Sequence, residues 1–217
     1  STADVTVSVA AVNDAPVLAS VADVSFDEDG SGSVSVSGSD VDGDQLTFSI
    51  TGGTDITASL SGTDVTFGAP ENYNGSEDFT VSVTDGEYTD SQSITVTVNA
   101  VNDAPTANAA TGATDEDQST VIALSGDDID GDVLTFSLYS NAVNGDVAIS
   151  GSFATYTPSA DFNGNDSFTF SVTDGQYSST ADVTVSVAAV NDAPVLASVA
   201  DVSFDEDGSG SVSVSGS

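Results

Sequence analysis

The chain has 217 residues, of which 35 are acidic and none is Lys, Arg or His, so its formal net charge is −35. Without cationic side chains it cannot form a phosphate-binding basic patch or be attracted to an anionic membrane surface, and we expect no nucleic-acid partner. The absence of Cys and His also excludes disulfides, thiolate metal sites and the commonest general base. Because 38% of the residues are hydrophobic and no apolar run is long enough to cross a membrane, we expect a packed core and no direct membrane insertion.

The chain opens on an alternating pattern that is typical of a half-buried strand. In residues 1–12, Val5, Val7 and Val9 face one way and the polar residues between them face the other. The hexapeptide Ala-Val-Asn-Asp-Ala-Pro at Ala11–Pro16 ends this alternation and precedes a new run of small apolar residues. It therefore marks a joint between two strand systems.

Further strands are predicted wherever apolar residues alternate between turn-forming pairs of Gly, Asp and Asn. In the first domain these strands span residues 21–26, 33–37, 45–51, 56–60, 64–67, 79–84 and 91–98. The second domain repeats this plan, and no segment shows a helical periodicity over a useful length. The predicted fold class is all-β, with tandem seven-stranded antiparallel Greek-key β-sandwiches joined end to end.

The same hexapeptide returns at Ala100–Pro105 and Ala189–Pro194, so that its Asn recurs every 89 residues. Residues 179–217 also repeat residues 1–39 without a change, 178 residues apart. The unit that repeats identically is therefore a pair of domains, and we expect the chain to be a window from a longer array.

We divide the chain into four parts on the basis of these joints. Residues 1–14 are the expected last strand of a preceding domain, residues 15–102 and 103–191 are expected to be complete β-sandwiches, and residues 192–217 are the expected first strands of a following domain. In the last part, Val202, Phe204, Val212 and Val214 are expected to take the places of Val24, Phe26, Val34 and Val36.

Acidic residues recur at fixed phases of the repeat, near the predicted strand ends. The clusters are Asp27–Asp29 with its matches Asp115–Asp117 and Asp205–Asp207, the stretch Asp40–Asp44 with its match Asp128–Asp132, the lone Asp85 with Asp174, and the Asn-Asp pair of each hexapeptide. An Asp-Gly turn or a soluble surface explains any one cluster. Four clusters in one phase, with no Lys or Arg to neutralise them, favour a cation, and Ca²⁺ prefers such oxygen ligands. A helix-loop-helix calcium loop is excluded, since Gly43 is misplaced and Thr51 stands where a bidentate Glu is required.

Over its whole length the chain resembles the tandem cadherin-like, or bacterial Ig-like, repeats of very long calcium-dependent surface adhesins. The stretch Asn102–Pro105 is similar to the cadherin linker motif Asp-x-Asn-Asp-Asn-Ala-Pro, and Asp40–Asp42 resembles the Asp-x-Asp strand end. Glu28 stands at the position of the family's early Glu, and Asp85 at that of its later lone Asp. One departure lies in the linker, where Ala100 replaces the first Asp and one Asn is missing.

The resemblance implies Ca²⁺ ions at the interdomain joints, each shared by the preceding domain, the linker and the following domain. The family's Asp-x-Glu motif is matched only by Glu71 and by Asp161. The implied metal ligands are Asn13, Asp14, Glu28, Asp40, Asp42, Glu71, Asp85, Asn102, Asp103, Glu116, Asp128, Asp130, Asp161, Asp174, Asn191, Asp192 and Glu206.

These expectations predict a mechanical role: extender repeats of an extracellular, cell-surface adhesin, stiffened by calcium and in contact with neighbouring repeats of the same chain. One alternative is a subunit of an extracellular filament formed by self-association. Another is a module that binds carbohydrate or protein, for which Tyr73, Tyr88 and Tyr177 are the candidate exposed aromatics. We expect no enzyme, because the carboxylate pairs that a glycosidase would need recur along the array instead of forming one site.

Overall fold

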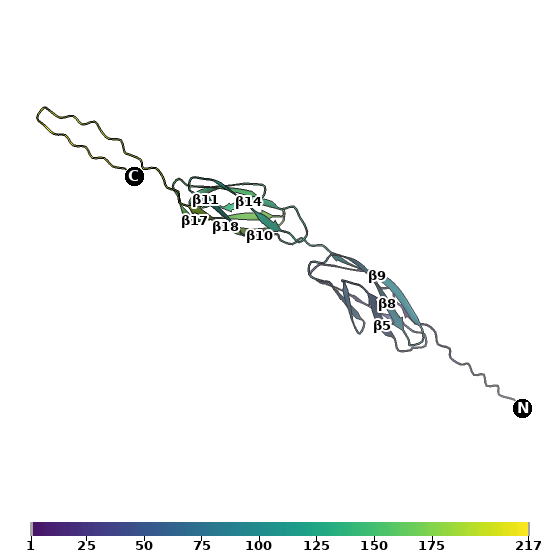
Figure 1. Cartoon of the computed structure of the whole chain (residues 1–217). Coiled ribbons are helices and arrows are strands. Elements are labelled where there is room, and N and C mark those ends of the chain that lie inside the picture. Colours follow the sequence, from purple (N-terminus) through teal and green to yellow (C-terminus); the bar gives the residue numbers. More distant parts are fainter. Residues whose placement is uncertain (1, 217) are drawn as a thin grey trace. The chain divides into compact units, whose positions relative to one another are not determined.

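The computed structural model of the protein describes residues 2–216, and every regular element within them is a β-strand (Figure 1). None of the described residues lies in a helix that could span a membrane. The chain divides into two compact units, which we name unit 1 (Ser1–Asn102) and unit 2 (Asp103–Ser217).

Unit 1 contains a sandwich of two main sheets. One has four strands in the order β2-β9-β8-β5, the other has three in the order β3-β7-β6, and β1 pairs with β4. The strands are β1 (Val17–Leu18), β2 (Val24–Asp27), β3 (Ser31–Ser35), β4 (Gly38–Ser39), β5 (Thr47–Gly52), β6 (Thr57–Ser61), β7 (Asp64–Gly68), β8 (Gly75–Thr84) and β9 (Thr89–Asn99).

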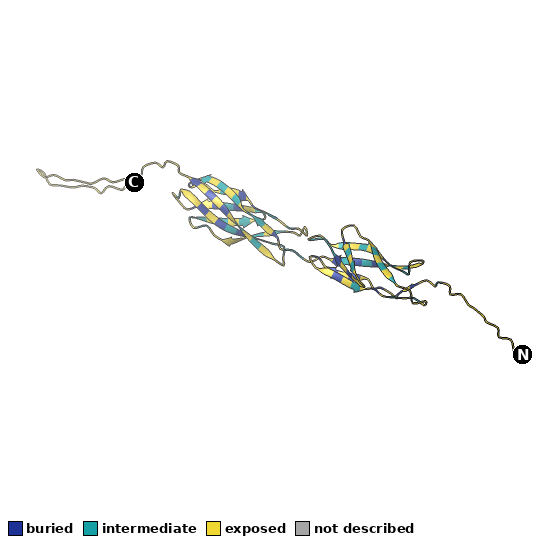
Figure 2. Cartoon of the chain, turned by 90° about the horizontal axis from the view of Figure 1, so that it is seen from below, coloured by how far each residue is buried: buried dark blue, intermediate teal, exposed yellow. Residues whose placement is uncertain are grey.

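The core of unit 1 follows from the alternation of its strands, visible in Figure 2 as buried and exposed residues taking turns along each arrow. In β8, Phe79, Val81 and Val83 are buried, whereas the Ser and Thr residues between them are more exposed. Phe67 of β7 meets Phe79 across the sandwich, with ring centroids 5.2 Å apart and planes 72° apart. This edge-to-face packing joins the two sheets.

Unit 2 repeats the arrangement. Its four-stranded sheet has the order β11-β18-β17-β14, its three-stranded sheet the order β12-β16-β15, and β10 pairs with β13. The strands are β10 (Thr106–Asn108), β11 (Ala110–Asp115), β12 (Thr120–Ala123), β13 (Ser125–Asp127), β14 (Thr135–Ser140), β15 (Gly145–Ser150), β16 (Phe153–Pro158), β17 (Gly164–Thr173) and β18 (Ser178–Ala188). The core gathers Tyr156, Phe168 and Phe170 with the valines of β17 and β18.

The prediction of tandem all-β sandwiches is confirmed, with differences in detail. Two pairs, β2 with β9 and β11 with β18, run parallel instead of antiparallel. Such a pair joins the first and last long strands of each unit, whose relative direction is not set by a hairpin. β8 also begins at Gly75, before the predicted residue 79, because Gly75 already pairs with Val98.

The described residues 2–12 form no strand in this structure, and the assignment of residues 1–14 as the last strand of a preceding domain stays a prediction. Val5, Val7 and Val9 are 79–88% exposed. Alternation alone does not make a strand, because the backbone N–H and C=O groups need a neighbouring strand to pair with.

Residues 195–216 form no named strand, yet they keep local contacts of the stretch that they repeat. The bridge between Leu196 and Gly216 corresponds to the pairing of Leu18 with Gly38. The N–H of Ala197 donates to the carbonyl oxygen of Ser215 at 3.0 Å, as the equivalent groups do at 2.9 Å in unit 1. The proposed correspondence of these residues with the first strands of unit 1 therefore has a structural basis, although their side chains are exposed.

Candidate metal centre

At the N-terminal end of unit 1, the linker is fastened to two of the recurring acidic residues. The side-chain Nδ2 of Asn13 donates to Oδ2 of Asp85 at 2.9 Å, and the N–H of Asp14 donates to Oδ2 of Asp42 at 2.7 Å. Both contacts join residues far apart in sequence, so the two Asp residues set where the linker lies on its own unit.

The loop that holds Asp42 is organised by Asp40, which directly follows β4. One carboxylate oxygen of Asp40, Oδ1, accepts the N–H groups of Asp42 (2.9 Å), Gly43 (3.0 Å) and Asp44 (3.2 Å). Gly43 has φ = 81° and open space at its Cβ position, so glycine is needed there for its backbone alone. The other oxygen, Oδ2, is buried and has no hydrogen-bond partner among the described residues.

Unit 2 builds the same loop from different residues. Oδ1 of Asp128 accepts the N–H groups of Asp130 and Asp132, both at 3.1 Å, and the N–H of Asp103 donates to Oδ2 of Asp130 at 2.8 Å. Oδ2 of Asp128 is again buried without a partner among the described residues. An acceptor left unsatisfied at the same position in both units calls for a ligand, because such burial costs free energy.

The third acidic position, Asp85 in unit 1 and Asp174 in unit 2, is oriented by backbone N–H donors. Oδ1 of Asp85 accepts the N–H groups of Glu87 and Tyr88, both at 2.7 Å, and Asp174 binds residues 176–177 in the same way at 2.6 and 2.7 Å. The N–H of Tyr88, together with the other donors, lowers the pKa of Asp85 from its ordinary value of 3.8, against the opposing effect of desolvation. Asp85 is therefore a carboxylate at neutral pH.

At the C-terminal end of each unit a buried glutamate holds the departing chain. Glu28 and Glu116 are each only 6% exposed. Oε1 of Glu28 accepts the N–H of Val101, and Oε1 of Glu116 accepts the N–H of Val190, both at 2.5 Å. In unit 2, Nδ2 of Asn163 also donates to Oε2 of Glu116 at 3.1 Å.

Three further carboxylates meet at the C-terminal end of unit 2. Asp117, Asp161 and Asp192 each offer an oxygen, and these oxygens lie within 4.8 Å of one another. The N–H of Asp161, whose φ is 57°, donates to Oδ1 of Asp117 at 3.1 Å. Asp161 and Asp192 also border a hollow that is completed by Ala193 and Val195.

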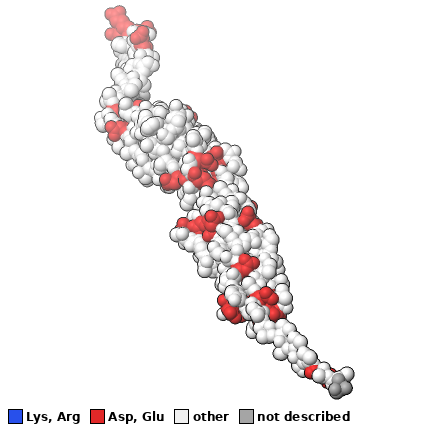
Figure 3. Space-filling view, turned by 90° about the vertical axis from the view of Figure 1, so that its right-hand side faces the viewer, with Lys and Arg blue, Asp and Glu red and all other residues white. Residues whose placement is uncertain are grey.

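The donor set fits a hard divalent cation. Ca²⁺ takes about six to eight oxygen ligands from carboxylates, amides and carbonyls. Asp40, Asp42 and Asp44 place carboxylate oxygens within 4.8 Å of one another. A hollow beside this loop is lined by Ala11, Val12, Asn13, Asp42 and Asp44. In Figure 3 the carboxylates gather in patches and no Lys or Arg appears, so no side chain of this protein neutralises their charge.

The structure brings most of the predicted ligands into these clusters, and leaves a few outside. Asn102 and Asp174 occupy the repeat positions of Asn13 and Asp85. Glu71 and Glu206 are exposed and make no hydrogen bond to another described residue. Nδ2 of Asn191 donates to the carbonyl oxygen of the next residue at 3.2 Å.

Some residues of these sites were not predicted from the sequence. Asp117 and Asp44 lie in the recurring acidic stretches but were not singled out as ligands, although each joins a carboxylate cluster. In unit 1 the position of Asp161 is held by Asn72, whose N–H donates to Oδ1 of Asp29 at 3.1 Å. The left-handed backbone of Asn72 and Asp161 brings their N–H groups toward the Asp-Glu-Asp stretch, which strand alternation does not indicate.

Two other acidic residues act inside the units. Glu77 accepts hydrogen bonds at 2.7–3.1 Å from the N–H groups of residues 54–56. Asp166 accepts them from residues 143–144 at 3.2 and 2.8 Å, and from the hydroxyl of Tyr156 at 3.0 Å. Both stand in the inward phase of a strand, where an acidic residue is unusual, and this was the signal that could have identified them.

These features define an Ig-like β-sandwich protein built from tandem repeats. A family model of the bacterial Ig domain matches residues 13–97 and 102–186, so the chain belongs to the bacterial Ig domain family. No curated protein matches the sequence.

Solved structures of cadherin repeats support the same fold. One crystal structure of human protocadherin-24 EC1-2 matches with a TM-score of 0.54 and 15% identity, over 81% of this chain and 99% of that chain. A second matches with a TM-score of 0.51 and 14% identity, over 83% and 100%. An endo-fucoidan hydrolase from glycoside hydrolase family 107 matches with a TM-score of 0.34 and 23% identity, over 81% of this chain, which spans only 29% of the hydrolase. The resemblance to cadherin-like repeats is confirmed at the level of fold.

Proposed function

We propose that the chain is an extender segment of a long extracellular adhesin on a cell surface, and that Ca²⁺ bound at its interdomain joints makes it rigid. In this role the repeats transmit position and force and perform no catalysis. Membership of the bacterial Ig domain family and the cadherin-like fold support the adhesion role. The calcium requirement rests on the acidic residues of this chain.

The observation that carries the proposal is the pair of buried, unpartnered oxygens, Oδ2 of Asp40 and Oδ2 of Asp128. Each belongs to a carboxylate whose other oxygen is fixed by backbone N–H groups, so the orientation of the side chain is set before any ligand arrives. A carboxylate oxygen that is removed from water and lacks a donor is costly. A bound cation relieves that cost, and this chain has no Lys, Arg or His side chain that could supply the positive charge instead.

Calcium at this position would stiffen the joint through groups that already hold the linker. The N–H of Asp14 is bound to Asp42, and the N–H of Asp103 to Asp130, within their own units. An ion on these Asp carboxylates would neutralise their mutual repulsion and would gain further oxygens from the Asn-Asp pair of the linker. The freedom of a short linker would then fall when the ion binds.

Calorimetric titration of the full chain with Ca²⁺, after removal of metal by a chelator, tests the proposal. We expect saturable binding that weakens when Asp40 and Asp128 are both replaced by Asn. The matched control is Asp64→Asn, because Asp64 is exposed and its carboxylate accepts a hydrogen bond from the Ser35 hydroxyl at 2.7 Å, away from the acidic loops. If the parent shows no saturable binding, or if the double variant binds as the parent does, the proposed site is wrong.

A second candidate function is a subunit of an extracellular filament. It is favoured by residues 195–216, which keep their local pairing but leave apolar side chains such as Phe204, 63% exposed, open to solvent. In a filament, strands of another copy would cover these residues. Sedimentation velocity over a range of concentrations distinguishes the two: reversible assembly supports the filament, and a monomer at all concentrations supports the extender.

A further inference from the structure

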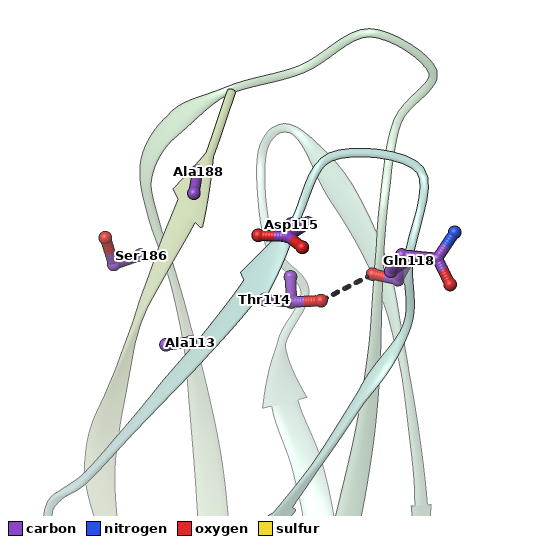
Figure 4. A pocket seen from close by; sticks show the side chains of 6 residues that line it. All are labelled: Ala113, Thr114, Asp115, Gln118, Ser186 and Ala188. Atoms are coloured by element: carbon purple, nitrogen blue, oxygen red, sulfur yellow. Dashed lines mark hydrogen bonds between the residues drawn. The ribbon is translucent and has the colours of Figure 1, made fainter. Parts of the chain in front are cut away.

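A shallow notch lies on the outward face of unit 2, between the parallel strands β11 and β18 (Figure 4). Its lining residues are Ala113, Thr114, Asp115, Gln118, Ser186 and Ala188. Asp115 and Ala188 are direct neighbours in the sheet, as are Ala113 and Ser186. The hydroxyl of Thr114 donates to the carbonyl oxygen of Gln118 at 2.9 Å, which fixes the turn that forms one wall.

In unit 1 the equivalent place between the two parallel strands is filled by the side chain of Asn99. Asn99 stands opposite Asp27 there, as Ala188 stands opposite Asp115 in unit 2. Nδ2 of Asn99 donates to Oδ1 of Asp27 and to Oγ of Ser25, both at 3.1 Å. An internal N–H donor therefore occupies in unit 1 the space that is open in unit 2.

Two sequence differences between the units open the notch in unit 2, and they also remove the hydrogen-bond donor to the carboxylate of Asp115. Ala188 stands where unit 1 has Asn99, and Ala113 stands where it has Ser25, so a short methyl replaces a polar group twice. No side chain among the described residues donates a hydrogen bond to the carboxylate of Asp115, which is exposed. The notch therefore presents the carboxylate of Asp115 beside the methyl groups of Ala113 and Ala188.

We propose that this notch receives an arginine or lysine side chain of a basic partner protein. The methyl groups of Ala113 and Ala188 suit the aliphatic stem, and the carboxylate of Asp115 suits the cationic head, at the place that the Asn99 amide takes in unit 1. Arginine fits best, because its planar fork can donate two parallel hydrogen bonds to one carboxylate. Asp115 is next to Glu116, one of the implied calcium ligands, but its own carboxylate is not in the group Asp40, Asp42 and Asp44 or in the group Asp117, Asp161 and Asp192.

The partner has to be a different protein. This chain contains no Lys, Arg or His, so a second copy has no side chain to offer the notch. One wall of the notch also recurs, since Ser8 and Ala10 repeat Ser186 and Ala188. A single exposed ion pair binds weakly, but sites repeated along an array give a basic partner many simultaneous contacts.

The test is NMR of the full chain with labelled alanine methyl groups, in buffer saturated with Ca²⁺ and at physiological salt. The probe is Nα-acetyl-arginine amide, and its neutral control is the citrulline analogue, which has the same shape without the charge. We expect the arginine probe to shift the methyl signals of Ala113 and Ala188 along a binding curve with a Kd of roughly 0.1–1 M, the affinity that one exposed ion pair supports. The citrulline probe should not.

Matched variants separate a built site from the general attraction of a cation to an acidic protein. Ala188→Asn should close the notch and abolish the shift at Ala113, while Asn99→Ala should open the equivalent place in unit 1 and produce a new shift in the signal of Ala100. Both positions are exposed, so neither change threatens the fold. Equal shifts in the parent and in Ala188→Asn, or shifts confined to the acidic loops, would overturn the proposal.

Discussion

In the core of unit 2 the hydroxyl of Tyr156 donates a hydrogen bond to Oδ2 of Asp166 at 3.0 Å, and both residues are buried. The equivalent residues of unit 1, 89 positions earlier, are Phe67 and Glu77. The longer Glu side chain there reaches its loop without help from a hydroxyl. The two units thus solve one problem, anchoring the loop before an edge strand, with two different pairs of residues.

Tyr156→Phe should destabilise unit 2 by about 1–2 kcal/mol, because one donor to a buried carboxylate is lost while its backbone donors remain. Denaturant unfolding followed by circular dichroism measures the change. The control is Tyr139→Phe, since Tyr139 is 71% exposed and should tolerate the loss of its hydroxyl. Equal stability of Tyr156→Phe and the parent would mean that the buried hydrogen bond contributes nothing net.

Acid should destabilise both units by protonating Glu77 and Asp166, the carboxylates that hold a loop inside each unit. The N–H of Thr54, with those of the next two residues, lowers the pKa of Glu77 below 4.5, and in Asp166 the donors outweigh desolvation and lower the pKa below 3.8. A group whose folded pKa is depressed stabilises the fold above its unfolded pKa, and this stability is lost as pH falls through the folded pKa. We therefore expect the unfolding midpoint to be nearly constant near neutral pH and to fall below about pH 4.

The variant Glu77→Gln measures how much Glu77 contributes to the loss of stability in acid. This variant keeps the size of the side chain but cannot be ionised, so its stability should be lower at neutral pH and should depend less on acid than that of the parent. An unchanged pH profile would show that Glu77 is not the titrating anchor.

Asp103→Ala should weaken calcium binding by at least about tenfold, the loss typical of residues that support a metal site. Asp103 lies in the linker motif, and the change removes its carboxylate while it keeps the N–H that donates to Asp130. Asp64→Ala should leave calcium affinity unchanged, since Asp64 lies outside the recurring clusters. Calorimetry gives both affinities, and equal binding by the two variants would contradict the assignment.

Calcium should change the dimensions of the chain more than the fold of each unit. The acidic clusters lie at the ends of the units, whereas the cores are mainly apolar, and the buried Asp166 belongs to no cluster. Small-angle scattering with calcium and with chelator should show an extended particle and a more flexible one, while circular dichroism stays the same. The same maximum dimension in both conditions would refute this expectation.

Gly53→Ala should destabilise unit 1 by about 1–3 kcal/mol through overpacking and backbone strain. Gly53 has φ = 75°, and a Cβ there would lie 2.3 Å from the carbonyl oxygen of Ile56 and 2.5 Å from the ring of Phe79. Gly62→Ala is the control, because φ is similar at 65° but the surrounding space is open. If the denaturant midpoints of Gly53→Ala and Gly62→Ala fall equally, the loss of stability comes from backbone strain and not from the contact with Ile56 and Phe79.

Local patterns were sufficient to predict much of this protein. Period-two alternation and Asp-Gly or Asn-Gly turns indicated the strands, since side-chain direction in a strand depends only on neighbouring residues. The 89-residue spacing indicated the tandem units, and the recurring acidic stretches indicated where carboxylates gather. A resemblance in the linker motif was needed to assign these carboxylates to common sites.

Only the tertiary structure decided which distant residues meet. It paired β2 with β9 in parallel, turned Glu28 inward to hold the N–H of Val101, and joined Asn13 to Asp85 across 72 positions. It also left one oxygen of Asp40 buried and unpaired while the other took three donors. Such contacts depend on how the two sheets pack and how the loops close over their ends, and neither is encoded in the spacing of neighbouring residues.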